Sequence, residues 1–311
     1  KALLWAAAGV AASSFAFYRL HPRLIYIPLV PGLPKTPQES PSPVDSPSSL
    51  ELEFEETMVP STDGVQIHTW FLPHKHRAKV PTVVFLHGNA GHMGFRLPNM
   101  AQLIDEVPCN VVMMDYRGYG HSTGSAVDDR GPVEDVEAVL TSIRARRDID
   151  THAIVLFGRS IGGAVAIQVA ARNPEQVAGL VVENTFTSVA DMADRIAPAL
   201  AWLAKPLLRV RYPSLQAVAS VQAPILFLSG ARDELVPPAH MEALHGAARS
   251  AAYSRFVSIA DGEHNDTWVR GGAKYWEELR AFVQGLASHP HGPATAAATA
   301  TTAAAAERQF L

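Results

Sequence analysis

Residues 153–168 read "AIVLFGRSIGGAVAIQ" and change character at their centre. A β-branched apolar run predicts a buried strand, and the small apolar residues after it predict a helix. Between the two stands G-x-S-x-G, with Gly158 and Gly162 on either side of Ser160. In that setting the serine hydroxyl projects from a sharp turn. The N–H of Ile161, at the helix N-terminus, is placed to stabilise negative charge on a bound group. The stretch predicts a nucleophile elbow; a glycine-rich turn with Ser160 as the helix N-cap is the alternative.

Short apolar runs of the same kind recur along the chain and alternate with helical patterns. A strand is expected at 65–72, and six more at 82–88, 110–116, 153–158, 179–184, 224–230 and 255–260. Several intervening segments have helix signals, such as the early proline and late arginines of residues 131–147. Strands alternating with helices predict an α/β fold, with a mostly parallel central sheet and helices on both faces. Such sheets bind ligands at the carboxyl ends of their strands.

An activated serine requires a general base and an acid that orients the base. In this architecture the acid and then the histidine follow the serine along the chain. Asp233 comes directly after the strand "PILFLSG" and is the expected acid, with Glu234 as its neighbouring competitor. His264 follows the last predicted strand and precedes the last helix, so it is the expected base. Asp266, nearby, is expected to form a local turn.

The developing oxyanion needs a second backbone donor, beside the N–H of Ile161. Residues 85–92, "FLHGNAGH", end a predicted strand in the kind of glycine-containing turn that leaves an N–H free. We expect Asn89 to supply that N–H through its main chain, with Ala90 as the alternative. His87 is expected to orient its neighbours or to be structural.

Composition limits the other classes of function. The chain has 311 residues, 48% of them hydrophobic, and a net charge of −4, so there is no basic excess to attract nucleic acid. Its single cysteine, Cys109, permits no intrachain disulfide and no CxxC site, and is expected to be a buried structural thiol. The thirteen histidines lack metal-ligand spacing, and no phosphate-binding loop motif is present. We therefore expect neither a metal nor a cofactor.

The two ends of the sequence differ from its centre. Residues 1–20 are mostly apolar and predict a membrane-anchor helix, with a cleaved targeting segment or a merely apolar helix as alternatives. Residues 21–49 are rich in proline and serine and predict an extended linker. A single domain is expected at 50–287, followed by a low-complexity Ala/Thr tail at 288–311. The expected location is a membrane, by a single pass; the organelle and side are left open.

Residues 187–222 lie where a lid would be inserted before the strand that carries the acid. They predict one or two helices interrupted near Pro198 and Pro206. Packing on the core is the expected role of their apolar side chains, with an acyl pocket or membrane contact as alternatives. These side chains are Ala199, Leu200, Trp202, Leu203, Leu207 and Leu208.

The region from about 50 to 286 resembles the α/β-hydrolase superfamily. Within it, the chain is similar to the group of alpha/beta-hydrolase domain-containing protein 13, a single-pass membrane protein, and its fungal and plant relatives. The resemblance rests on "FLHGNAGHMGFRLPN", "MDYRGYGHSTG", "LFGRSIGGAVAI", "VVENTF", "LVPP" and "GEHNDTW". It implies a serine hydrolase with Ser160, Asp233 and His264 as its triad and no cofactor, and it supplies no substrate.

Two classes of function therefore stand side by side. The first is a membrane-anchored serine hydrolase of an ester, thioester or amide, with an acyl lipid or acyl protein as the most plausible substrate and a peptidase as a variant. The second is a membrane-anchored scaffold of the same fold without turnover. The presence of all three triad residues favours the hydrolase, because a scaffold has no physical need for them.

Overall fold

The computed structural model describes residues 12–287. Residues 1–11 and 288–311 lie outside it, so the predicted anchor is covered only in part and the predicted tail is not covered. Residues 12–20 are helical and lead into α2 (Pro22–Ile25). Within the described range, none of the helices has the length and apolar character needed to cross a bilayer.

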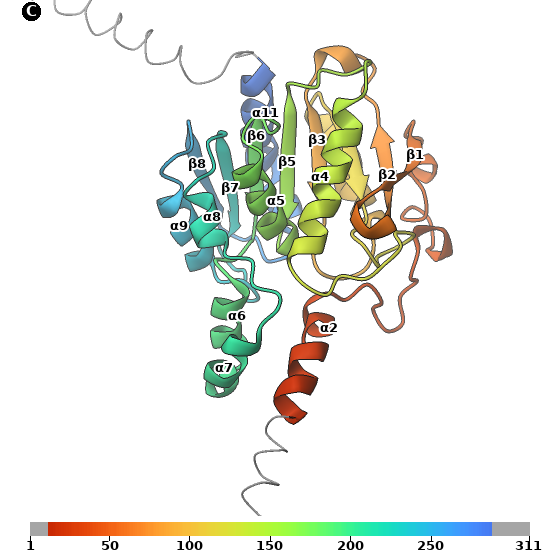
Figure 1. The fold of residues 1–311 in the computed structure, drawn as a ribbon. Coiled ribbons are helices and arrows are strands. Elements are labelled where there is room, and N and C mark those ends of the chain that lie inside the picture. The colour runs from red at the N-terminus through yellow and green to blue at the C-terminus, as the bar shows by residue number, and fades with distance from the viewer. Residues whose placement is uncertain (1–11, 288–311) are drawn as a thin grey trace, which may run out of the picture.

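One sheet runs through the middle of the molecule (Figure 1). Its strands are β1 (Glu55–Pro60), β2 (Gln66–Leu72), β3 (Thr82–Leu86), β4 (Asn110–Met114), β5 (Ile154–Arg159), β6 (Gly179–Glu183), β7 (Ile225–Gly230) and β8 (Ser254–Ile259). Their order is β1-β2-β4-β3-β5-β6-β7-β8. β2 pairs antiparallel with β1 and β4, and every other pair is parallel. The predicted α/β fold with a mostly parallel sheet is confirmed.

The central strands are buried along their whole length, because helices cover both faces of the sheet. Successive side chains of β3 enter opposite cores: Val84 packs in one, and Val83 and Phe85 in the other. Edge strand β1 was not predicted. Its sequence "EETMVP" has one buried side chain, Val59, so no apolar pattern marks it.

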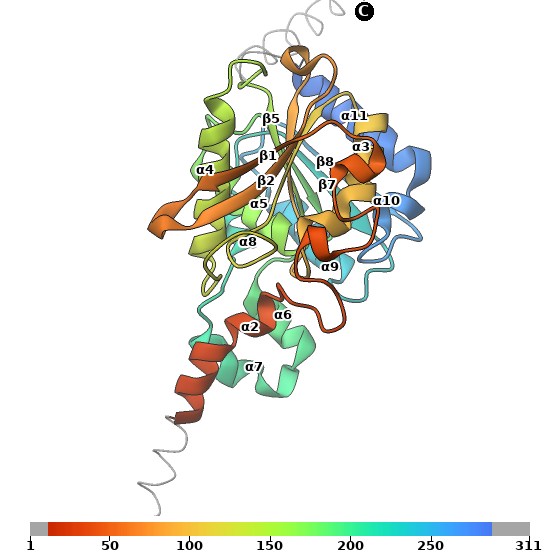
Figure 2. The same ribbon diagram turned by 90° about the vertical axis from the view of Figure 1, so that its right-hand side faces the viewer.

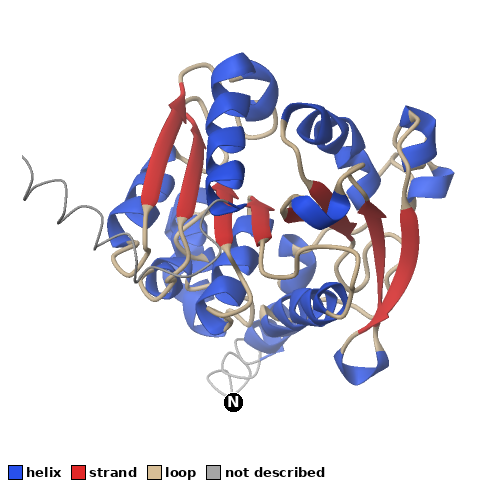
Figure 3. Ribbon diagram, turned by 90° about the horizontal axis from the view of Figure 1, so that it is seen from above, coloured by secondary structure: helices blue, strands red, loops and turns tan. Residues whose placement is uncertain are grey.

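Helices lie on both sides of the twisted row of strands when the molecule is seen from above (Figure 3). One core is covered by α4 (Arg130–Arg144), α5 (Ile161–Arg172), α8 (Ser214–Val218) and α9 (Pro238–Ala247). The other is covered by α3 (Leu97–Glu106) and α11 (Gly272–Ala287), with α10 (Thr267–Arg270) beside them. Short 3₁₀-helices lie in the loops between strands: η3 (Thr62–Gly64), η4 (Arg77–Lys79) and η5 (Met93–Arg96).

The segment between β6 and β7 projects from one end of the molecule. The projecting part contains α6 (Val189–Ile196), α7 (Pro198–Ala204) and η6 (Lys205–Leu207), whereas α8 of the same segment packs on the core, and the predicted interruptions at the two prolines are present. Leu208 packs in the core as expected. Leu200, Trp202 and Leu203 do not, because they are 61%, 71% and 52% exposed. For these three side chains the expected packing on the core is wrong.

The segment predicted as a linker lies against the domain and contains two short 3₁₀-helices, η1 (Pro37–Glu39) and η2 (Pro47–Leu50). The Tyr26 hydroxyl is 2.8 Å from the Tyr212 hydroxyl, and Ser40 Oγ is 2.9 Å from His92 Nε2. The Ile27 N–H donates to the Asn89 oxygen at 2.9 Å. The segment of residues 21–49 therefore contacts the turn around Asn89, which is expected to bind the oxyanion.

Candidate active site

Ser160 stands between β5 and α5 in a backbone conformation that a non-glycine residue rarely adopts, with φ 55° and ψ −122°. Two bonds from the end of β6 hold it there. The Ser160 N–H donates to the backbone oxygen of Glu183 at 2.9 Å, and Thr185 Oγ1 donates to the backbone oxygen of Ser160 at 2.7 Å. The strained turn is thus fixed by the neighbouring strand, as functional turns commonly are.

Gly158 and Gly162 allow this turn to pack closely. A Cβ atom at Gly158 would lie 2.2 Å from the Gly162 oxygen, and one at Gly162 would lie 2.1 Å from the Leu86 oxygen. Both obstacles are backbone atoms, so neither can rotate away. The G-x-S-x-G spacing reflects the approach of α5 to β5 and β3.

Three side chains from three strand ends form a connected chain of hydrogen bonds. Ser160 Oγ is 3.1 Å from His264 Nε2, and His264 Nδ1 is 2.7 Å from Asp233 Oδ2. The carboxylate is an acceptor, so Nδ1 carries the proton and Nε2 is left to accept from the serine hydroxyl. Glu234, the competing acid, is exposed. Asp266 accepts from the Glu263 N–H at 2.8 Å, in the local turn expected of it.

Asp233 is buried and receives further hydrogen bonds on its other oxygen. Asp233 Oδ1 accepts from the N–H groups of Leu235 at 3.0 Å and Val236 at 2.8 Å. These bonds orient Oδ2 toward the imidazole. The Asp233 carboxylate is therefore held by backbone N–H groups, and its orientation does not depend on a partner with a flexible side chain.

The expected oxyanion donors lie beside the serine. Ile161 begins α5, where the first N–H groups of a helix have no intrahelical acceptor. Asn89 and Ala90 line the same cavity as Ser160 and His264. The Asn89 oxygen accepts from the Tyr119 hydroxyl at 2.8 Å, which keeps the turn in place.

His87 is fully enclosed beneath this turn. Its Nδ1 is 2.7 Å from the Gly88 oxygen, and its Nε2 is 3.4 Å from Asp115 Oδ1. Burial raises the pKa of Asp115, but the nearby imidazoles of His68 and His87 and the hydrogen bond from the Met93 N–H lower it more strongly, to about 2. The acid stays charged and holds the loop, which agrees with a structural role for His87.

Two other residues have structural roles, and for Cys109 the sequence predicted that role. Arg117 makes an ion pair with Asp135, with Nη2 2.7 Å from Oδ1. Cys109 is completely buried, and burial raises the pKa of its thiol to about 12. Within the described part of the chain, no three His, Cys, Asp or Glu side chains converge as metal ligands would.

Asn184, which the sequence patterns did not single out, joins the acid and histidine loops. Its Nδ2 donates to the oxygens of Glu263 at 3.1 Å and His264 at 3.2 Å, and to Thr267 Oγ1 at 2.7 Å. Its Oδ1 accepts from the Gly230 N–H at 2.8 Å. The available signal was an asparagine at the end of a buried strand, where it can adopt the positive φ of 48° that it has here.

Arg159, the variable residue before the serine, was also missed. Its guanidinium is buried, and Nη2 donates to the His264 oxygen and to Asn265 Oδ1, both at 2.7 Å. Its Nε is 3.5 Å from Glu183 Oε1, and Glu183 Oε2 accepts from the Tyr275 hydroxyl at 2.5 Å. A buried ion pair next to the nucleophile thus supports the loop that carries the histidine.

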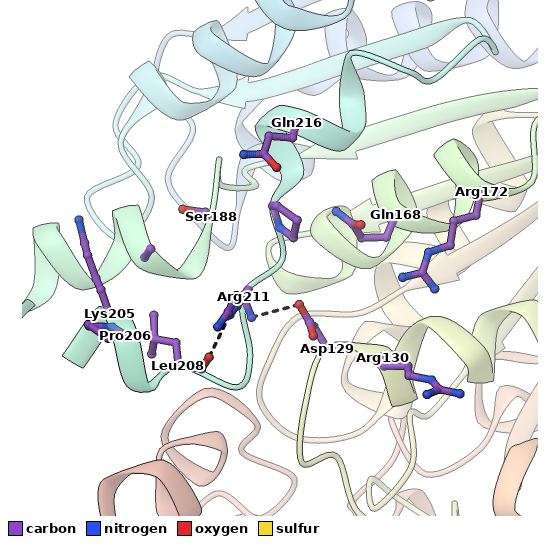
Figure 4. Close-up of a pocket in the computed structure, with 12 residues that line it drawn as sticks. Asp129, Arg130, Gln168, Arg172, Ser188, Lys205, Pro206, Leu208, Arg211 and Gln216 are labelled. Carbon is purple, nitrogen blue, oxygen red and sulfur yellow. Dashed lines mark hydrogen bonds between the residues drawn. The ribbon is translucent and has the colours of Figure 1, made fainter. Parts of the chain in front are cut away.

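Ser160 lines a cavity of about 340 Å³. Its apolar walls come from Val30, Leu33, Phe95 and Leu235. A larger cavity of about 870 Å³ lies elsewhere, between α4, α5 and the segment around η6 (Figure 4). Of these two, the smaller is lined by Ser160 and is the one relevant to its chemistry.

Comparison with known proteins agrees with this architecture. The alpha/beta hydrolase domain-containing protein WAV2 of Arabidopsis thaliana is 39% identical over 274 residues, which cover 84% of this chain and 87% of WAV2. The chain belongs to the α/β-hydrolase family. A family model described as serine aminopeptidase, S33, matches residues 77–217 of this α/β-hydrolase.

Two further similarities are to a yeast protein and to a solved structure. The uncharacterized membrane protein YNL320W of Saccharomyces cerevisiae is 30% identical over 267 residues, which cover 86% of this α/β-hydrolase and 89% of the yeast protein. The esterase Pf2001 of Pyrococcus furiosus superposes with a TM-score of 0.61 at 19% identity, covering 78% of this chain and 94% of the esterase. The second similarity shows the shared fold. Family and fold together place the protein among the α/β-hydrolases.

Proposed function

We propose that the protein is a serine hydrolase that cleaves an ester, thioester or amide through an acyl-enzyme. The observation that carries this proposal is the hydrogen-bonded chain from Ser160 to His264, 3.1 Å, and from His264 to Asp233, 2.7 Å. A serine hydroxyl is a weak nucleophile unless a base accepts its proton as it attacks.

In the proposed reaction Ser160 Oγ attacks the carbonyl carbon of a small-molecule, lipid or acyl-protein substrate while His264 Nε2 takes the hydroxyl proton. The carbonyl oxygen becomes negative and binds to the N–H groups of Ile161 and Asn89. The imidazolium, stabilised by Asp233, gives its proton to the leaving group, and the acyl group remains on Ser160. Water then attacks the acyl-enzyme with His264 as base, which releases the acid and restores the hydroxyl.

The membrane is the second part of the proposal, and exposed apolar side chains support it. The helix formed by residues 12–25 and the α6–α7 segment project from the same end of the molecule (Figures 1 and 2). They are joined by His21, whose Nε2 accepts from the Arg209 N–H at 2.9 Å. The exposed side chains at this end are Phe15, Tyr18, Leu20, Leu24, Ile196, Leu200, Trp202 and Leu203. An apolar surface of this kind fits the interface of a bilayer.

Basic side chains near this apolar surface are also consistent with membrane contact. The larger cavity is lined by Arg130, Arg172, Lys205 and Arg211, with Asp129 accepting from the Arg211 N–H at 3.1 Å (Figure 4). Basic side chains beside an apolar surface attract anionic lipid headgroups. With a relative named as a membrane protein, this favours acyl lipids or acyl proteins as substrates.

The catalytic part is tested with p-nitrophenyl esters from acetate to palmitate. Ser160→Ala and His264→Ala should each lower kcat/KM by at least about 10³-fold, because the remaining groups cannot activate a nucleophile. Ser220→Ala, at an exposed serine that bonds only within its own turn, is the matched control. Turnover of aminoacyl anilides in preference to all esters would favour the peptidase. A folded protein that cleaves neither class would favour the scaffold.

The membrane part is tested by flotation of the whole chain with anionic phosphatidylserine vesicles. Trp202→Ser removes the one aromatic side chain of α7, which is 71% exposed, and should weaken vesicle binding. Tyr253→Ser is the matched control, because Tyr253 is 50% exposed but lies at the N-terminal end of β8, whereas α6 and α7 follow the C-terminal end of the parallel strand β6. Equal binding by both variants would argue against membrane contact through α7.

A further inference from the structure

Arg96 lines the cavity that contains Ser160 and His264. It ends η5 and directly precedes α3, so backbone on both sides fixes its position. Its side chain is half-buried. Its one hydrogen bond in the described structure is long, 3.5 Å from Nη2 to Asn265 Oδ1, and no carboxylate of the described residues makes an ion pair with it.

The two buried arginines among the described residues have anionic partners. Arg117 pairs with Asp135, and Arg159 lies next to Glu183. Arg96 instead shares its acceptor with a cation, because Asn265 Oδ1 already accepts from Arg159 Nη2 at 2.7 Å. Two guanidinium groups thus converge on one amide oxygen beside the serine, and positive charge is left over in the cavity.

Burial and the nearby charge of Arg159 lower the pKa of Arg96 to about 9, and the charge of Glu183 offsets part of this effect. The guanidinium still carries its charge at neutral pH. A guanidinium that is partly shielded from water and makes no ion pair gains a partner when an anion enters the cavity, so the cavity favours an anionic ligand. A guanidinium matches carboxylate and phosphate oxygens in particular, because its planar N–H groups can donate to two oxygens at once.

We propose that Arg96 binds an anionic group of the substrate, a carboxylate or a phosphate, and that the protein selects acyl esters carrying such a charge near the scissile bond. This inference rests on the proposed function. The apolar walls accept the hydrocarbon part of the substrate, and the guanidinium accepts its charged part. Arg96 is thereby a specificity residue, in contact with substrate but outside the proton-transfer chain.

A purely structural role for Arg96 makes a different prediction. If Arg96 only supported the loop of His264 through Asn265, its loss would affect charged and neutral esters equally. Arg159 already donates to that loop with two bonds of 2.7 Å, whereas Arg96 contributes one contact of 3.5 Å. The contacts therefore favour substrate recognition over loop support.

Two pairs of substrates separate charge from shape. Mono-p-nitrophenyl adipate carries a carboxylate at the end of its acyl chain, and its methyl ester is the neutral partner. Lysophosphatidate carries a phosphate on its alcohol, and monoacylglycerol is the neutral partner. The wild-type protein should prefer the charged member of at least one pair by about tenfold or more in kcat/KM. The pair that shows the preference identifies which side of the ester carries the anion.

Arg96→Gln should lower this charged-to-neutral ratio at least about tenfold, mainly through KM, and Arg96→Lys should retain part of it. Arg249→Gln, at an exposed arginine in a turn, should leave the ratio unchanged. An equal loss on both members of a pair, or a wild-type ratio near one in both pairs, would overturn the proposal.

Binding to Ser160→Ala, measured by calorimetry with the same four compounds, keeps the inference testable without turnover. In at least one pair the charged compound should bind more tightly than its neutral partner, and the added substitution Arg96→Gln should remove the difference. Equal binding overturns the anion site. A preference for charge without any hydrolysis by the wild-type protein would support the site and contradict the proposed function.

Discussion

Arg159 Nη2 donates to the backbone oxygen of His264 at 2.7 Å. Arg159 directly precedes Ser160, so the neighbour of the nucleophile also holds the proposed general base. The Asn184 amide reaches the same oxygen from β6, at 3.2 Å. Two side chains from neighbouring strands therefore fix the position of the imidazole before any substrate binds. Such preorganisation is what proton transfer between a serine and a histidine requires.

We predict that Asn184→Ala lowers both stability and turnover. The substitution removes four hydrogen bonds between loops and places alanine at a φ of 48°, which should cost roughly 2–4 kcal/mol in the free energy of unfolding. At temperatures where the variant is folded, kcat should fall about tenfold or more, because the His264 loop is no longer fixed.

Asn173→Ala is the matched control for this prediction. Asn173 Nδ2 donates to Glu137 Oε1 and to the Val169 backbone oxygen, both at 3.0 Å, but it lies at the far end of α5. It should lower stability modestly and leave kcat unchanged. Denaturant unfolding together with ester hydrolysis separates the two effects, and an unchanged kcat in Asn184→Ala would contradict the assigned positioning role.

Gly158→Ala should prevent the elbow from forming. The new methyl group would lie 2.2 Å from the Gly162 oxygen, so strand and helix would have to separate. We expect a loss of more than about 3 kcal/mol in unfolding free energy or no folded protein at all. The comparison is Gly246→Ala in α9, where nothing lies within 4 Å and helix propensity should add about 0.5–1 kcal/mol. A folded and active Gly158→Ala variant would disprove the close packing.

Stability should fall in mild acid because of His92. Its Nδ1 accepts from the Gly94 N–H at 3.1 Å, and burial lowers its pKa to about 4. The unfolded chain, with a pKa near 6.5, takes up a proton before the folded chain does. The contribution of His92 is therefore complete above about pH 6.5 and is lost as the pH falls toward 4, by up to about 3 kcal/mol.

Denaturant unfolding at about pH 7.5 and about pH 5 measures this loss. His92→Asn keeps an oxygen that can accept from Gly94 but cannot titrate, so its stability should change less between the two conditions. His152→Asn, at an exposed histidine, should behave like the wild-type protein. An identical pH dependence in all three proteins would show that His92 is not the titrating group.

Much of the candidate site was predictable because each of its members follows an apolar strand. The elbow, the acid and the histidine are marked by local patterns, and the parallel sheet brings the ends of its strands to one edge. Arg159 and Asn184 were not predictable in this way. Their partners are 105 and 80 residues away, so their roles depend on loop contacts that leave no trace in local periodicity.

The ends of the domain show a similar limit. Proline and serine predict an absence of regular structure in residues 21–49, yet single contacts such as Ser40 with His92 decide that the segment packs on the domain. The spacing of apolar residues in α7 does not distinguish a helix packed on the core from an exposed one. Its side chains are exposed because α7 projects beyond the sheet, which is a property of the whole fold.

The central claim, that Ser160 is an activated nucleophile, is tested most directly with a fluorophosphonate reagent and mapping of the labelled peptide by mass spectrometry. Labelling should occur at Ser160 in the folded wild-type protein and in Ser220→Ala. It should be absent in Ser160→Ala and strongly reduced in His264→Ala. Labelling at another serine, or none at Ser160 in the folded wild-type protein, would contradict the proposed mechanism.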